Sequence, residues 1–106
     1  MIKHNEFRVI GTVVAVFFEY RPKKGATNNE TVPICEVELA PNGNNERMKI
    51  VFFYDKAESA GAELVENDII LCKGRIKATK NTYQGKTTFN TELWGSDFQK
   101  DLRAAA

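Results

Sequence analysis

The order of the predicted secondary-structure elements constrains this fold more than any other feature of the sequence. Five segments are rich in Val, Ile, Phe and Thr, and several of them alternate apolar with polar residues, as β-strands do. They span residues 7–20, 33–40, 47–54, 69–79 and 87–94. A helix is expected directly after the third strand, because Asp55 and Glu58 have capping-box spacing and small or apolar residues recur at helical spacing up to Val65. The chain therefore predicts three strands, one helix and two strands.

A helix between the third and fourth strands of a five-stranded Greek-key barrel is the signature of the OB-fold. We therefore predict an all-β OB-fold barrel formed by residues 1–103 as a single domain. Gly11 interrupts the long first strand, which suits a bulge or a bend in a curled barrel strand. The alanines at 104–106 are expected to be a disordered tail or a cloning remnant.

Composition excludes several classes of protein. The chain is 42% hydrophobic and 27% charged, as ordinary globular proteins are. It contains neither a run of ~20 apolar residues nor the apolar core of a signal peptide. Cys35 and Cys72 lie far apart in apolar segments, which favours free thiols in a reducing, cytosolic compartment over a disulfide. With His4 as the sole histidine and no metal-ligand spacing, nucleophile set or phosphate loop, we expect no enzyme, no cofactor and no metal.

The net charge of +1 conceals an uneven distribution along the chain. Residues 1–27 carry five basic and two acidic side chains. Residues 28–72 carry three basic and nine acidic side chains, and residues 73–106 carry seven basic and three acidic ones. Residues 73–91 contain five basic side chains and no acidic one. Such a chain can present one basic surface while it stays nearly neutral overall.

OB-folds bind oligonucleotides or oligosaccharides on the face of strands two and three and on two loops, which join strands one to two and four to five. Here these loops are predicted at residues 21–32 and 80–87. They contain the basic residues Arg21, Lys23, Lys24, Lys80 and Lys86. The ligand face is therefore predicted to be basic; the alternative is that these are solvated positions that discourage edge aggregation.

Four segments in this order carry a resemblance to a known family. They are Asn5–Val13, Tyr54–Glu58, Glu66–Ile76 and the Thr-rich Thr87–Leu93. Over most of its length the chain resembles the single-stranded DNA-binding protein (SSB) family, whose members have the OB-fold. The resemblance implies sequence-nonspecific binding and protection of single-stranded DNA in replication, recombination or repair. A dimer or tetramer is also expected, since one small basic groove binds weakly and tandem grooves gain avidity. The expected location is the cytoplasm of a bacterial or phage-infected cell, in association with the nucleoid.

The chain departs from the family pattern in two places. The family often has one Trp in the third strand and another near the hairpin tip, where this chain has Met48 and residues 81–83. The family's acidic, partner-recruiting C-terminal tail has no counterpart in the sequence up to Ala106. Because neither of the two positions has a Trp here, base stacking would depend on other aromatic residues.

The third strand offers two apolar faces, with Val51 and Phe53 on one and Phe52 and Tyr54 on the other. The resemblance puts Val51 and Phe53 inside the barrel, so Phe52 and Tyr54 are predicted to stack on bases. Alternatively this strand lies in a dimer interface or under a loop.

Other strands supply further candidates. Phe18 and Tyr20 are predicted on the ligand side of the first strand, with Phe17 in the core. Trp94 is expected to pack within the closing strand rather than to touch DNA.

The last two strands supply the remaining candidates. Arg75 and Lys77 alternate with apolar residues and are predicted to follow the phosphates. Tyr83, near the hairpin tip, is a candidate for base stacking.

Two competing functions remain open at this stage. An OB-fold adaptor could bind a protein through its apolar third strand, which the acidic residues 28–72 would favour. An RNA-binding OB domain would have the same sequence features.

Overall fold

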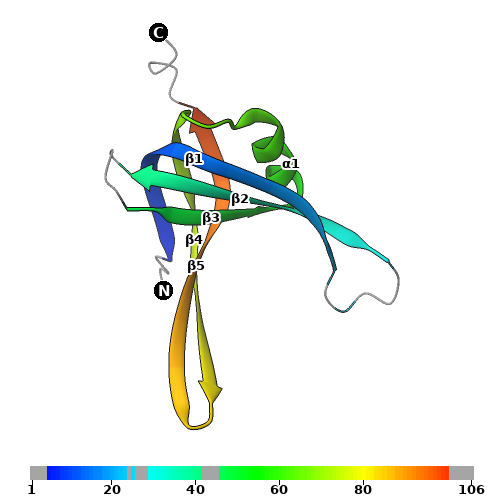
Figure 1. Cartoon of the computed structure of the whole chain (residues 1–106), viewed down its shortest axis with the longest axis vertical. Helices are drawn as coiled ribbons and strands as arrows, with labels where there is room; N and C mark the ends of the chain where they lie inside the picture. The colour runs from blue at the N-terminus through cyan, green and yellow to red at the C-terminus, as the bar shows by residue number, and fades with distance from the viewer. Residues whose placement is uncertain (1–4, 24, 26–28, 42–45, 101–106) are drawn as a thin grey trace.

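The computed structural model describes residues 5–23, 25, 29–41 and 46–100. Five strands close into a barrel in the order β1-β2-β3-β5-β4, with one helix between β3 and β4 (Figure 1). The elements are β1 (Glu6–Pro22), β2 (Thr31–Pro41), β3 (Met48–Phe53), α1 (Tyr54–Glu63), β4 (Ile69–Tyr83) and β5 (Lys86–Lys100). The predicted OB-fold is confirmed. Lys24 and the predicted tail at 104–106 lie outside the described residues.

Strand β1 pairs with two different strands of the barrel. It pairs with β4 from Glu6 to Thr12 and with β2 from Gly11 to Pro22, antiparallel in both cases. The register on β2 shifts between Val13 and Ala15. A bulge of this kind adds one residue to a strand and bends it, so the side chains beyond it exchange faces. The irregularity predicted at Gly11 thus falls a few residues further along.

The parallel pairing of β3 with β5 closes the barrel, with Ile50 opposite Leu93 and Val51 opposite Trp94. Phe52 points inward and is 0% exposed. Its ring packs so closely on β5 that a Cβ at Gly95 would lie 2.3 Å from it, so this position of β5 has room only for glycine.

Helix α1 packs at one end of the barrel (Figure 1). Its small side chains belong to the barrel core. Ala57, Ala60 and the following Leu64 are buried against the strands. The helix begins at Tyr54, and its N-cap, Phe53, makes no side-chain capping hydrogen bond. The predicted capping box at Asp55 is therefore wrong, because the chain enters the helix directly from β3.

Two hairpins extend beyond the barrel, β1–β2 and β4–β5 (Figure 1). The first predicted loop is strand only at its ends, since β1 continues to Pro22 and β2 begins at Thr31. The second predicted loop is largely strand, because only Gln84 and Gly85 separate β4 from β5. Both of these turn residues have positive φ (50° and 78°), as a two-residue turn of type I′ requires.

Both cysteines are free and buried in the core, as predicted. Burial raises the pKa of the Cys35 thiol to about 11 and that of Cys72 to about 12. Both thiols are therefore protonated at neutral pH and behave as small apolar side chains. Among the described residues, no helix has the length and apolar character needed to cross a membrane.

Phe52 and Phe53, which are neighbours on β3, test which face of this strand points into the barrel. Phe52→Ala should lower the free energy of unfolding by about 3–5 kcal/mol, because it removes a fully buried ring from the core. Phe53→Ala is the matched control and should cost clearly less, since Phe53 is only half-buried on the opposite face. Urea denaturation measures both. Equal losses, or a larger loss for Phe53→Ala, would show that the faces of β3 have been assigned the wrong way round.

Candidate nucleic-acid interface

The prediction that Phe52 stacks on a ligand is wrong, because its side chain lies wholly inside the barrel. In β2 it is opposite the buried Cys35, and its ring makes an edge contact with Phe98, with centroids 5.7 Å apart. Val51 and Phe53, predicted inside, are on the outer face of β3.

That outer face borders a hollow of about 540 Å³. We call this hollow the groove; it is lined by Arg21, Glu36, Met48, Lys49, Val51, Phe53, Thr91, Glu92 and Leu93. Strands β1, β2, β3 and β5 all contribute to it. The groove therefore lies over strands two and three, where OB-folds bind their ligands.

An aromatic pair stands at the groove. The Phe53 and Trp94 rings meet at a centroid distance of 4.9 Å and an interplanar angle of 61°. Lys77 Nζ lies 4.7 Å from the centroid of the Trp94 ring, within cation–π range. Trp94 Nε1 donates a 2.9 Å hydrogen bond to Glu92 Oε2. These contacts hold two partly exposed rings and one cation in a fixed arrangement.

Carboxylates inside the groove pair with its cations. Arg21 donates hydrogen bonds to Glu19 and, through Nη2 at 3.0 Å, to Glu36. The other oxygen of Glu36 lies 3.8 Å from Lys49 Nζ. The carboxylates of Glu19 and Glu36 raise the pKa of Arg21 above its usual value. The groove is therefore of mixed charge, whereas the sequence predicted a basic one.

The aromatic residues of β1 lie on the opposite faces from those predicted. Phe18 is opposite the inward-facing Cys35, and its ring is so close to α1 that a Cβ at Gly61 would lie 2.8 Å from it. Tyr20 makes an edge contact with Phe18 at 5.3 Å. The predicted placement of Phe18 and Tyr20 at the groove is therefore wrong. Phe17, expected in the core, is opposite Glu36 on the groove side and is 55% exposed.

Tyr54 and Lys23 lie at the margins of the predicted site. Tyr54 is exposed and begins α1 with φ 57°, an uncommon conformation for a tyrosine. It is not among the described residues that line the groove. Lys23 follows β1 and forms a 3.7 Å ion pair with Glu30 across the β1–β2 hairpin.

Arg75 and Lys77 project on the same face as the groove. Arg75 is opposite Trp94, and Lys77 is opposite Glu92. Among the described residues, no carboxylate lies within ion-pair distance of either cation. Both side chains are exposed; that they follow the phosphates stays a prediction.

The remaining predicted residues lie on the projecting part of the β4–β5 hairpin. Tyr83 is opposite Lys86 next to the turn, and Lys80 is opposite Phe89. Tyr83 is 75% exposed. The structure thus places these three predicted residues away from the barrel, on an extended ribbon.

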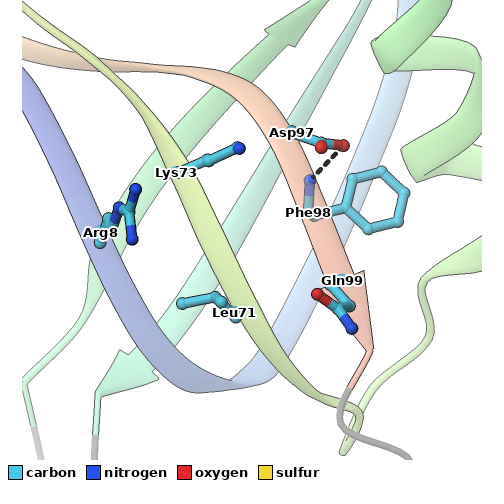
Figure 2. Close-up of a pocket in the computed structure, with 6 residues that line it drawn as sticks. All are labelled: Arg8, Leu71, Lys73, Asp97, Phe98 and Gln99. Atoms are coloured by element: carbon cyan, nitrogen blue, oxygen red, sulfur yellow. Dashed lines mark hydrogen bonds between the residues drawn. The ribbon is translucent and has the colours of Figure 1, made fainter.

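A second, smaller hollow of about 120 Å³ lies on another wall of the barrel (Figure 2). It is lined by Arg8, Leu71, Lys73, Asp97, Phe98 and Gln99, from β1, β4 and β5. Asp97 accepts hydrogen bonds from Lys56 Nζ and from the Phe98 backbone N–H, both at 2.9 Å, and these lower its pKa. Among the residues that line it, Asp97 is thus already paired, and Phe98 is partly buried against the barrel core.

Sequence reasoning missed Phe53 and Lys49, which line the groove, and Trp94 and Phe17, which lie on the same side of the barrel. One signal was available: Lys49 shares its face with Val51 and Phe53, and a lysine indicates the solvent side of a strand. The exchange of faces at Phe17 had no such signal, because nothing in the sequence marks the bulge after Val13.

Among the described residues, no group of three or more His, Cys, Asp or Glu side chains is placed to hold a metal ion. The described groups that could contact a ligand are therefore aromatic rings, cations and carboxylates on an open face of the barrel.

Comparison with known proteins identifies the type of fold. No family model and no curated protein matches the chain. The crystal structure of the SSB domain of a Synechococcus sp. protein resembles it with a TM-score of 0.66 and 22% identity, over 92% of this chain and 97% of that one. The mitochondrial single-stranded DNA binding protein of S. cerevisiae resembles it with a TM-score of 0.66 and 10% identity, over 93% and 96%. The chain thus has an SSB-like OB-fold.

Proposed function

We propose that the chain binds single-stranded DNA without sequence preference and without catalysing a reaction, and that the groove is the binding site. One observation carries this proposal. The half-buried Phe53–Trp94 pair lies beside Lys77 on the outer face of an SSB-like barrel, over the strands that carry ligands in OB-folds. A partly exposed pair of rings flanked by a cation suits bases and phosphates together.

Binding would combine two physical effects. Bases stack on the exposed parts of Phe53 and Trp94, which is worth about 1–3 kcal/mol per base and tolerates any base. Phosphates lie near Arg75 and Lys77 and release their condensed counterions. The duplex is excluded, because its bases are already stacked on each other and cannot reach the rings.

The cellular role belongs to the same proposal. Sequence-nonspecific protection of single strands fits replication, recombination or repair, at the nucleoid of a bacterial or phage-infected cell. We also propose a dimer or tetramer, since one groove with so few cations binds weakly and linked grooves gain avidity. An RNA strand offers the same bases and phosphates, so the first titration includes oligo(U) alongside oligo(dT).

Trp94 is the only tryptophan of the chain, so its fluorescence reports on the groove. Oligo(dT) of about 30 nucleotides should quench this fluorescence, and added salt should reverse the effect, because counterion release drives part of the binding. Phe53→Leu should weaken binding roughly 5- to 150-fold, the range expected for the loss of one stacked base. Fluorescence titration at several salt concentrations measures both.

Tyr20→Leu is the matched control, because it removes an exposed ring on the other side of the β1–β2 hairpin. It should bind as the wild type does. If oligo(dT) leaves Trp94 fluorescence unchanged at low salt, or if duplex DNA displaces the single strand, the proposed function is wrong. The outer face of β3 would then be examined as a protein-docking surface.

Glu36 competes with phosphate for two groove cations, Arg21 and Lys49. Glu36→Gln removes that competing charge and keeps the shape of the side chain. It should therefore strengthen oligo(dT) binding about 3- to 10-fold at low salt, with a smaller gain at high salt. Glu58→Gln on α1 makes the same change in net charge away from the groove and should have little effect. An equal gain in both variants would mean that overall charge, not the groove, controls affinity.

A further inference from the structure

The β1–β2 hairpin extends from the barrel on the side of α1, and two of its aromatic rings remain partly exposed there (Figure 1). The Phe18 ring lies against the helix at Gly61, where an added Cβ would come within 2.8 Å of it. The Tyr20 ring meets the Phe18 ring edge-on at a centroid distance of 5.3 Å. Phe18 is 37% and Tyr20 is 57% exposed, so both rings keep apolar surface in contact with solvent. An apolar patch of this kind is typical of an interaction site.

A hollow of about 260 Å³ lies between Phe18 and α1. It is lined by Phe18, Glu58, Gly61 and Ala62, and we call it the α1 hollow. Pockets for small molecules usually enclose about 300–1,000 Å³. The α1 hollow is smaller, and it therefore suits one side chain of a larger partner better than a whole small molecule.

The α1 hollow and the groove are on opposite faces of β1. Phe17 is opposite Glu36 on the groove side, and Phe18, the next residue, is opposite the inward-facing Cys35. Successive side chains of a strand point to opposite faces. Among the described residues, none that lines the α1 hollow also lines the groove. A ligand in one of them therefore leaves the other free.

The charge beside the α1 hollow is negative. Residues 54–68, which are α1 and the turn after it, contain five acidic side chains and one basic one. The basic one, Lys56, is paired with Asp97. Within the part of the chain that the structure describes, no cation lies within ion-pair distance of Glu58 or of Asp55, which is one helical turn before it.

These carboxylates determine which class of partner fits the rings. They repel the phosphates of a nucleic acid and attract cationic side chains. A lysine or arginine can pair with Glu58 and lie over the exposed face of Tyr20, where a cation–π contact forms. An apolar side chain next to that cation fills the α1 hollow, as an anchor residue fills a pocket at a protein interface.

We infer that the α1 hollow is a docking site for a basic segment of another protein. The segment inserts one apolar side chain beside Phe18 and places a cation at Glu58. This inference goes beyond the proposed function and does not depend on it, because the groove and the α1 hollow share no described residue. It assigns separate faces of one barrel to nucleic acid and to a protein partner.

The probe is a fluorescein-labelled peptide of about 12 residues that contains lysines and two phenylalanines, followed by fluorescence anisotropy. Titrations at about 0.15 M salt screen attraction beyond about 8 Å. Glu58→Lys should weaken binding roughly 5-fold or more, because it puts a cation where the peptide needs a carboxylate. Phe18→Leu should also weaken it, because the anchor loses the ring that it packs against.

Two matched controls should bind the peptide as the wild type does. Glu38→Lys makes the same change in net charge at an exposed position of β2, and Phe17→Leu removes the neighbouring ring on the groove side. Phe18→Leu should leave the affinity for oligo(dT) unchanged. Thermal unfolding checks that Phe18→Leu is folded, and Glu58→Lys, on the exposed surface of α1, tests the site independently of that ring.

Three outcomes would overturn the inference. If a peptide of lysines alone binds as tightly, or Glu38→Lys weakens binding as much as Glu58→Lys does, only overall charge is involved. If the wild type binds oligo(dT) but not the peptide, the α1 hollow has no such partner and the proposed function still stands. If Glu58→Lys changes the oligomeric state of the free chain in sedimentation velocity, the α1 hollow holds a second copy of the chain instead.

Discussion

The inward packing of Phe52 determines which residues this barrel presents to solvent. Its ring fills the space over Gly95, where β3 and β5 pair in parallel and close the barrel, and any larger residue at 95 would collide with it. Because side chains alternate along a strand, burying Phe52 turns Lys49, Val51 and Phe53 outward. The same closure brings Trp94 beside Phe53. The position of Phe53 and Trp94 thus follows from a contact inside the barrel core.

The sequence predicted the fold well and the faces of two strands badly. The predicted order of strands and helix is confirmed, because it depends on the pattern of apolar residues over many positions, which a local irregularity does not change. Which face a side chain occupies depends on the register of single residues. On β1, the bulge between Val13 and Ala15 puts Phe17 on the outer face and Phe18 on the inner face. On β3, the faces were assigned from the family resemblance, although the lysine at position 49 indicated the opposite assignment. Arg75 and Lys77 share one face of β4, as their spacing predicts, because both lie beyond the register shift between Lys73 and Gly74 and the pairing with β5 is regular from there. The extension of the second predicted loop into a ribbon was missed because Lys and Asn are depleted in strands and Gly85 marks a turn.

In the proposed binding of single-stranded DNA, the groove and the β4–β5 hairpin have different roles. In the groove, Arg21 is paired with Glu19 and Glu36, and Lys49 with Glu36, so the net attraction of these cations for phosphate is small. On the projecting part of the β4–β5 hairpin, Lys80 is opposite the exposed Phe89 and Lys86 is opposite the exposed Tyr83. Under the proposed function, the barrel supplies the rings for stacking, and the hairpin lysines supply an attraction for phosphate that weakens as salt rises.

The central claim is that the outer face of β3 and β5 is the nucleic-acid interface, and mapping of backbone amide shifts by NMR tests it most directly. The 15N-labelled chain is titrated with oligo(dT). The account predicts that the largest changes occur at Lys49, Val51, Phe53 and Trp94, on the outer face, while Phe18 and the α1 residues stay nearly constant. Changes centred on Phe18, Tyr20 and α1, or no changes at all with oligo(dT) in excess, would contradict it.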